Sequence, residues 1–290
     1  MNLRSGITLL TLLVALLSVW ATIHGISAVT DKSFYDHLSI REQSVKVYGT
    51  GLYRHMPAEV AVQGIAQDYV TLFLAVPLLL IGLYFFRMEN VRGKILLTGL
   101  LLYFTVTYMI YLTMGMYNEI FLVYVGILAC ALIALISSLA AFNYRLLKGA
   151  FERVRSLRPA AYFLLVNCLL IALLWLDVVV PPLFDGSIYP EELYHFTTLI
   201  VQGLDLAIFL PLGVVSAILA LWRHSEGFVF TSVYIVFLAI LMIALTTKVL
   251  FMAAQGQQVV PVIFVMPTIA AIAIFFSLNI LFQLKLGSTD

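Results

Sequence analysis

The sequence predicts an all-α integral membrane protein with about eight transmembrane helices, and three observations lead to this fold class. Of the 290 residues, 63% are hydrophobic and 11% are charged, whereas soluble domains are about 45–50% apolar and about 25% charged. The apolar residues form continuous runs, such as 70–86 and 160–176, that match the roughly 20 residues needed to cross a bilayer. These runs lack strand-like alternation, which argues against a transmembrane barrel. The composition excludes a soluble enzyme, a disordered chain, a coiled coil and a disulfide scaffold, and the net charge of +1 gives no sign of a nucleic-acid partner.

Hydropathy averaged over about 19 residues places eight spans along the chain. The first span, 7–29, follows Arg4 as the apolar part of a signal peptide would, but Ile26-Ser27-Ala28 is a poor cleavage site. We expect a retained helix, because the second half of the chain has a counterpart for it. Cleavage, the alternative, would leave the topology of the other spans unchanged. The later spans are 66–86, 95–116, 120–142, 160–181, 197–222, 228–253 and 261–284.

The Lys and Arg residues are distributed unequally between the two sets of connections. Eleven of the 16 lie on one side, namely Arg4, Arg87, Arg92, Lys94, Arg145, Lys148, Arg153, Arg155, Arg158, Arg223 and Lys285. The other side holds Lys32, Arg41, Lys46 and Arg54, all in the loop 30–65, and Lys248 lies within a span. The positive-inside rule then predicts that both termini are cytoplasmic, in a multi-pass protein of the plasma (inner) membrane.

Two similar series of residues indicate an internal repeat that divides the chain near residue 150. The series are Leu52-Tyr53-Arg54-His55, Val62-Gln63-Gly64, Asp68, Pro77 and Arg87, and then Leu193-Tyr194-His195, Val201-Gln202-Gly203, Asp205, Pro211 and Arg223. Each copy would contain four crossings, so both copies would share one orientation, as in a parallel 4+4 repeat. The predicted units are 1–142, which includes the outer loop 30–65, and 160–290, joined by a basic cytoplasmic linker at 143–159.

Ionisable residues inside the spans are the first candidates for a functional site, because an unpaired charge in the bilayer core costs at least about 2.5–3.5 kcal/mol. Asp205 and Lys248 lie at similar depths in consecutive antiparallel spans, so an ion pair is feasible, and snorkelling of Lys248 to the interface is the alternative. Asp68 is embedded in the same way if its helix begins near Pro57, and otherwise flanks that helix. Asp177, at the end of its span, is expected at the interface.

Prolines and glutamines accompany these charges in both halves. Pro77 and Pro211 lie near the middle of the second and sixth spans, where a helix break either marks a packing kink or lines a substrate site. Gln63 and Gln202 precede them on the outer side and would line, with the aspartates, an outward-opening cavity between the two repeats. Tyr108 and Tyr111, deep in the third span, are expected to bond neighbouring helices, with contact to a ligand as the alternative, and Tyr117 is expected in an interfacial belt.

The histidines offer a second type of site. His55 and His195 occupy matching positions in the two series and would jointly ligate a metal ion if an Asp completed the set. The alternative is that each is an interfacial residue, since neither belongs to a ligand pair on one helix.

These residues favour a secondary transporter or permeation protein for a small solute or ion, since no nucleotide-binding motif is present. Asp205, Lys248, Asp68, Gln202 and Gln63 would form its site. The first alternative is an outward-facing metal-binding protein or enzyme. Catalysis is the less favoured of these functions, because the sequence contains no known catalytic motif. The second is a sensor or accessory subunit, with retinal on Lys248 as a special case. The lipid bilayer is the expected partner, a partner subunit or a second copy remains open, and the sequence assigns no cofactor.

Overall fold

The computed structural model describes residues 2–27, 33–152, 154–187 and 189–284. Within these residues, eight helices are long and apolar enough to cross a membrane. The chain is therefore a multi-pass integral membrane protein, and the prediction of eight spans is confirmed. Lys32, Arg153 and Lys285, three of the basic residues used to orient the chain, lie outside the described residues.

The spans follow one another in the predicted order. They are α1 (Leu3–Ser27), α2 (Ala58–Val70) with α3 (Val76–Arg87), α4 (Val91–Met114), α5 (Phe121–Ala140), α7 (Leu157–Val179), α8 (Ile200–Leu204) with α9 (Leu210–Leu221), α10 (Ser225–Ala254) and α11 (Val262–Gln283). The remaining elements are the short helix α6 (Tyr144–Glu152) and an antiparallel hairpin of β1 (Phe34–Leu38) and β2 (Ser44–Tyr48).

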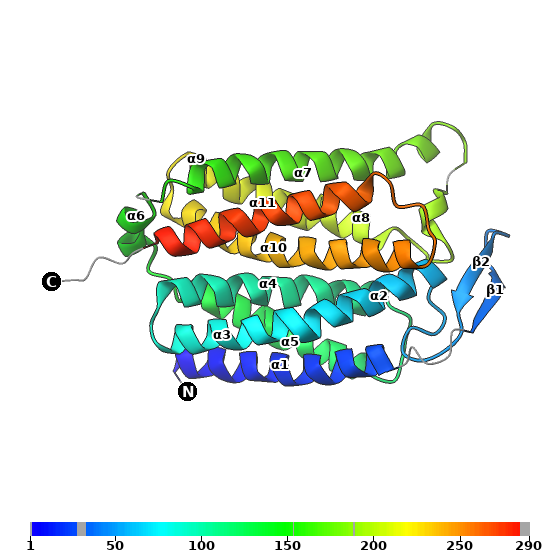
Figure 1. Cartoon of the computed structure of the whole chain (residues 1–290), viewed down its shortest axis with the longest axis horizontal. Coiled ribbons are helices and arrows are strands. Elements are labelled where there is room, and N and C mark those ends of the chain that lie inside the picture. Colours follow the sequence, from blue (N-terminus) through cyan, green and yellow to red (C-terminus); the bar gives the residue numbers. More distant parts are fainter. Residues whose placement is uncertain (1, 28–32, 153, 188, 285–290) are drawn as a thin grey trace.

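The helices form two groups that meet along α4 and α10. Figure 1 shows α1 to α5 in the lower half of the molecule and α7 to α11 in the upper half. Helix α4 contacts α10, and α10 also packs on α2. A Cβ atom at Gly99 of α4 would overlap the Val236 side chain of α10, so the glycine permits this close approach. The start of α1, the end of α11 and α6 lie at one end of the bundle, called here the terminal end, and β1 and β2 lie at the other, the hairpin end (Figure 1).

Two spans contain a π-helical segment ahead of a proline. Thr71–Ala75 joins α2 to α3, and Asp205–Phe209 joins α8 to α9. Pro77 and Pro211 each occupy the second position of the helix that follows. Proline lacks an N–H group and its ring clashes with the carbonyl four residues earlier in a regular α-helix. A wider π-type turn relieves this conflict without breaking the span.

The two π-helical segments begin 134 residues apart, and the features that follow them keep this spacing. Helices α3 and α9 share it at both ends, and α4 and α10 begin with it. Glu89 and Arg223, also 134 residues apart, both adopt the left-handed conformation, with φ of 61° and 63°. Gly93 and Gly227 follow, and at each of them a Cβ atom would overlap the backbone of the preceding helix.

The second span begins well before the boundary predicted from hydropathy. Helix α2 begins at Ala58, directly after Pro57, whereas the sequence placed the span at 66–86. Gln63, Gln67 and Asp68 lower the hydropathy of these turns, although the last two side chains are buried in the structure. The condition set for an embedded Asp68 is therefore met.

The hairpin was not predicted, and it takes part in a cap over the hairpin end. This hairpin cap comprises 33–57 and 189–199 and shares a small apolar core with α2. Arg41, in the turn between the strands, donates from Nη2 to the carbonyl oxygens of Tyr194 (2.6 Å) and Phe196 (2.9 Å). The Tyr194 hydroxyl donates to Glu59 of α2 at 2.9 Å. These bonds tie the connection between α7 and α8 to the first half of the chain.

Candidate functional site

The Asp68 carboxylate is the most enclosed of the predicted site residues, with 2% of its surface exposed. The Tyr53 hydroxyl donates to Oδ2 at 2.5 Å, and the Tyr111 hydroxyl lies 3.2 Å from Oδ1. Tyr111 also donates to the carbonyl oxygen of Gly64 at 3.0 Å. Gly25 of α1 lies against the same Oδ2 atom and beside the Tyr53 ring, and a Cβ atom there would overlap the carboxylate. The absence of a side chain at residue 25 therefore makes room for Asp68.

Tyr53 reaches this position from the hairpin cap rather than from a span. Gly64 leaves space for its ring, which a Cβ atom at that position would overlap. Burial, and then the negative charge of Asp68, raise the pKa of Tyr53 well above its usual value. The phenol therefore stays protonated at neutral pH and acts as a hydrogen-bond donor to the carboxylate.

Four tyrosine rings pack against one another next to the carboxylate. The Tyr111 ring centroid lies 6.5 Å from that of Tyr53, 5.6 Å from that of Tyr108 and 5.5 Å from that of Tyr124. The rings meet in edge-to-face and tilted arrangements, and the hydroxyls of Tyr53 and Tyr111 lie 3.3 Å apart. Phenol oxygens and aromatic faces are both groups that attract cations.

A second set of hydrogen bonds lies one residue before Asp68. Gln67 donates from Nε2 to the Tyr103 hydroxyl at 2.7 Å, and the hydroxyl of Thr71 lies 2.9 Å from the same oxygen. All three side chains are buried. The interior between α2 and α4 is therefore polar over more than one helical turn, which is unusual at membrane depth.

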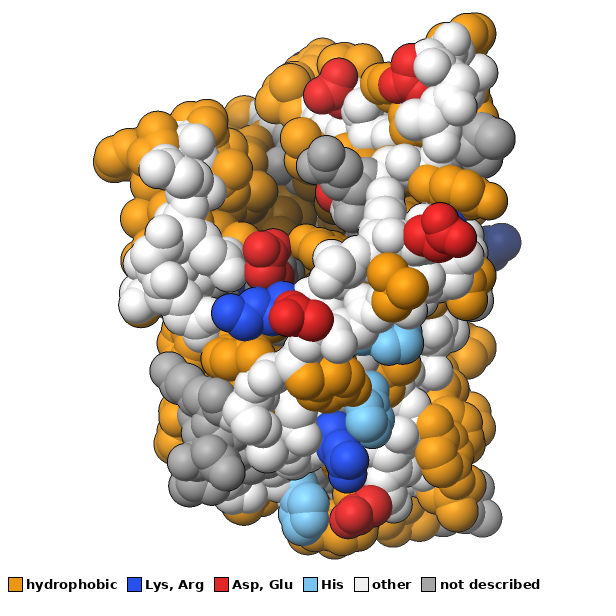
Figure 2. Space-filling view, turned by 90° about the vertical axis from the view of Figure 1, so that its right-hand side faces the viewer, with side chains coloured by type: hydrophobic (Ala, Val, Ile, Leu, Met, Phe, Trp, Pro, Cys, Tyr) orange, Lys and Arg blue, Asp and Glu red, His pale blue; other side chains and the backbone are white. Residues whose placement is uncertain are grey.

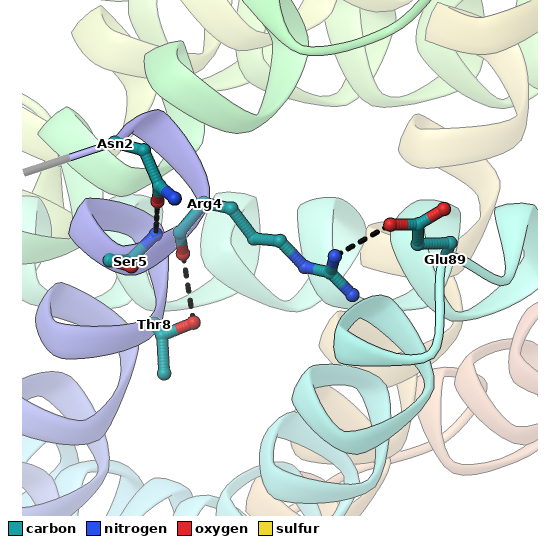
Figure 3. Close-up of polar contacts among 5 residues, drawn as sticks. All are labelled: Asn2, Arg4, Ser5, Thr8 and Glu89. Carbon is teal, nitrogen blue, oxygen red and sulfur yellow. Dashed lines mark hydrogen bonds and ion pairs between the residues drawn. The ribbon is translucent and has the colours of Figure 1, made fainter.

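Lys248 of α10 connects the charges of the two halves. It is half-buried and lies close enough to interact electrostatically with both Asp68 and Asp205. Among the described residues, no ion pair within 4.0 Å joins it to either carboxylate. The ion pair found there is Arg4–Glu89 at the terminal end, with 2.7 Å between Nη1 and Oε1 (Figure 3).

Asp205 is less enclosed than Asp68 and has a different partner. Its Oδ2 accepts a hydrogen bond of 2.8 Å from Nε1 of Trp175 on α7. The side chain is half-buried at the first position of the π-helical segment. Asp177, near the end of α7, is exposed as expected for an interfacial residue.

The two predicted glutamines lie apart from the carboxylates. Gln202 lines a cavity of about 340 Å³ together with Tyr189, Thr198 and Leu206. This cavity lies beside the hairpin cap, and Figure 2 shows that face of the molecule hollowed in its upper part. Gln63 is half-buried on α2, and no hydrogen bond of its side chain is found within the described part of the chain.

The structure brings the two predicted histidines to one place but not to one ligand set. Nε2 of His195 donates to the backbone oxygen of His55 at 2.9 Å, and Nδ1 of His55 lies 2.6 Å from the Tyr35 hydroxyl. No group of three or more His, Cys, Asp or Glu side chains arranged to hold a metal occurs among the described residues. The metal site stays a prediction without a third ligand.

Several residues of the site were not identified from the sequence. Tyr53, Trp175 and Gly25 each contact a carboxylate from a different part of the chain. The one part of this site that the sequence indicated was the embedded Tyr111, which was expected to bond a neighbouring helix. It donates to the Gly64 carbonyl of α2.

No family model, curated protein or solved structure matches the chain. The fold and the site together define a multi-pass integral membrane protein with a tyrosine-bound carboxylate in its interior.

Proposed function

We propose that the chain is a secondary transporter or permeation protein for a small solute or ion, and that Asp68 binds a cation or a proton during transport. The enclosure of Asp68 carries this proposal. Ionisable residues at membrane depth are costly and commonly mark substrate or ion pathways. Here two tyrosine hydroxyls hold a 2%-exposed carboxylate within electrostatic reach of Lys248. Structural roles rarely need such an arrangement, because an apolar pair of similar volume would stabilise the helices as well.

Lys248 and Asp205 take supporting roles in this proposal. An occupied site would carry a positive charge next to Asp68, and Lys248 would then be repelled toward Asp205. An empty site would leave Lys248 as the counter-charge of Asp68. Two carboxylates that compete for one ammonium group thus give the two-state element that alternating access requires.

An internal repeat belongs to the same proposal. The common 134-residue spacing of the π-helical segments, the prolines and the following glycines supports a parallel duplication of 1–142 and 160–290, joined by the linker 143–159. Interrupted helices in corresponding places of two halves are a feature of transporter binding sites. In this spacing the counterpart of Asp68 is Gln202, and that of Asp205 is Thr71.

The proposed orientation places both termini and α6 on the cytoplasmic side of a plasma (inner) membrane. The start of α1 and the end of α11 lie at the same end of the bundle (Figure 1). Arg145, Lys148, Arg155 and Arg158 are exposed there, in and after α6. The positive-inside rule supports a cytoplasmic location for this end.

Electrophysiology on a solid-supported membrane tests the function. Proteoliposomes would receive concentration jumps of Na⁺, K⁺, methylammonium and protons as separate probes. We expect a transient current with at least one probe, its loss in Asp68→Asn and a smaller current in Lys248→Gln. Asp177→Asn, which changes an exposed carboxylate, is the matched control and should keep the wild-type current. Folded wild-type protein that gives no current with any probe, or full current in Asp68→Asn, would overturn the proposal.

A further inference from the structure

Two hydroxyl groups of α1 lack the hydrogen bond that such groups usually make in a membrane helix. Buried Ser and Thr side chains commonly donate to the carbonyl four residues earlier, as Thr22 and Thr105 do here, each at 2.8 Å. Thr11 and Ser18 are fully buried, yet their hydroxyls have no hydrogen-bond partner in the described structure. They are seven residues apart and therefore lie on one face of the helix.

Two further unpartnered atoms lie in the helices of the same half. The Tyr108 hydroxyl of α4, which interacts with Ser18, is 1% exposed and has no hydrogen-bond partner within 3.5 Å in the described ranges. Oε1 of Gln67 is in the same condition. An unsatisfied buried polar group costs about 1–3 kcal/mol, and ordered water is the usual partner of such groups. Within the described residues, Thr11 and the Gln67 oxygen lack any partner, and Ser18 and Tyr108 have only each other, so the first half of the bundle offers buried polar atoms that internal water would satisfy.

The face of α1 that carries these hydroxyls connects two distinct places. Toward the hairpin end of this face, Gly25 lies against the Asp68 carboxylate. Toward the terminal end, Ile7 lines a cavity of about 340 Å³ together with Arg4, Glu89 and Lys94. From Ile7 to Gly25 the helix rises roughly 27 Å at 1.5 Å per residue. Thr11 and Ser18 lie between these two points on α1, and Tyr108 of α4 lies next to Ser18.

We propose that internal waters along Thr11, Ser18 and Tyr108 conduct protons between the terminal-end cavity and Asp68, so that the proton is the coupling ion of the proposed transport. In each step an oxygen accepts one proton from the neighbour on the cavity side and releases another toward Asp68. The O–H bond that forms on one oxygen is balanced by the O–H bond that breaks on it. The last proton protonates the carboxylate. One positive charge has then moved along the line of Thr11, Ser18 and Tyr108, called here the seam. This inference rests on the proposed function of Asp68.

The second half does not offer the same seam. At the 134-residue spacing, Met242 stands for Tyr108 and Leu245 for Tyr111. Both replacements lack a hydroxyl, and the hydroxyls of Thr246 and Thr247 that follow them donate to backbone carbonyls of α10. The route is therefore assigned to the first half alone.

Hydroxyl-radical footprinting by X-ray radiolysis tests the waters without any need for transport. Radicals form from water in place, so a buried tyrosine is labelled only where water adjoins it. We expect Tyr108 to be labelled several-fold faster than Tyr234, which is also buried but donates its hydroxyl to the Phe209 carbonyl at 2.8 Å. Equal and slow labelling of the two tyrosines would overturn the hydrated seam.

Proton uptake by proteoliposomes tests the relay itself. A pH-sensitive dye inside the vesicles reports influx driven by a potassium diffusion potential. Thr11→Val and Ser18→Ala should each slow the wild-type influx by about tenfold. Thr22→Val is the matched control, since Thr22 is equally buried on the same helix but donates its hydroxyl to the Ser18 carbonyl. Unchanged influx in the first two variants, or an equal loss in the control, would overturn the relay.

The two proposals fail in different ways. Cation currents that need Asp68, with no proton influx, would refute the proton seam and leave the transporter proposal standing. Proton influx sensitive to Thr11→Val, with full activity in Asp68→Asn, would refute the role of Asp68 and leave a conducting seam that ends elsewhere.

Discussion

The two halves of the molecule share a helical framework and differ in the chemistry of their interiors. The π-helical segments, the prolines and the helix starts recur 134 residues apart. Yet Asp68 is enclosed by hydrogen-bonding tyrosines, whereas Asp205 is half-buried and bonded to Trp175. The framework depends on backbone requirements such as proline accommodation and close glycine contacts. The polar site depends on which side chains α4 presents, and α10 presents apolar ones in their place.

The largest expected difference between the halves concerns two glycines. Gly25→Ala should lower the free energy of unfolding by about 2–3 kcal/mol, because the new Cβ overlaps the Asp68 carboxylate. Gly203→Ala on α8 meets nothing within 4 Å and should be neutral or stabilise by up to about 1 kcal/mol. Unfolding titrations in mixed detergent micelles measure both. Similar values for the two variants would mean that Asp68 is not held as tightly as described.

A smaller difference is expected for the donors to the two carboxylates. Tyr111→Phe removes a hydroxyl from both Asp68 and the Gly64 carbonyl and should cost about 1–3 kcal/mol, because both acceptors are buried. Trp175→Phe should cost less, since Asp205 is half-buried and water can replace the lost N–H group. The same titrations compare them, and a reversed order would contradict the assigned burial.

The hairpin cap should respond to acid. Burial, and then the charges of His37, Arg41 and His55, lower the pKa of His195 below 6.5, against the opposing effect of its bond to the His55 carbonyl. A lowered folded-state pKa gives stability that is present above pH 6.5 and is lost as the pH falls through the folded value. Hydrogen exchange of 189–199, after correction for the intrinsic slowing of amide exchange in acid, should therefore report an opening constant that is several-fold larger at pH 5 than at pH 7.5. His195→Gln should remove this increase, and an unchanged pH response in that variant would exclude His195 as the titrating group.

The smallest effect is expected at the terminal end. Arg223 occupies the position in the second half that Glu89 has in the first, so the Arg4–Glu89 pair has no counterpart of the same charge (Figure 3). Arg4→Gln should change the free energy of unfolding by less than about 1 kcal/mol, because Glu89 is 80% exposed. A larger loss in the micelle titration would show that this pair locks the first half.

Hydropathy and charge predicted the spans, and the helix start at Pro57 was correctly identified as the condition for an embedded Asp68. The tyrosine site could not be predicted, because Tyr53 and Tyr111 come from segments far apart in the sequence and meet only after packing. The sequence match of Val62-Gln63-Gly64 with Val201-Gln202-Gly203 made the two aspartates appear equivalent. Counted from the π-helical segments, Asp68 lies three residues before the first and Asp205 begins the second. Backbone hydrogen bonding decides that register, and hydropathy does not report it.

In the proposed function, the first half of the molecule holds the functional carboxylate. The most direct test of this claim compares transient currents of Asp68→Asn and Asp205→Asn proteoliposomes at equal amounts of folded protein, with the probe that gives the largest wild-type current. We expect Asp68→Asn to abolish the current and Asp205→Asn to keep at least about half of it. The amide oxygen of an asparagine at residue 205 can still accept the hydrogen bond from Trp175. Loss of the current in Asp205→Asn together with full current in Asp68→Asn would contradict the claim.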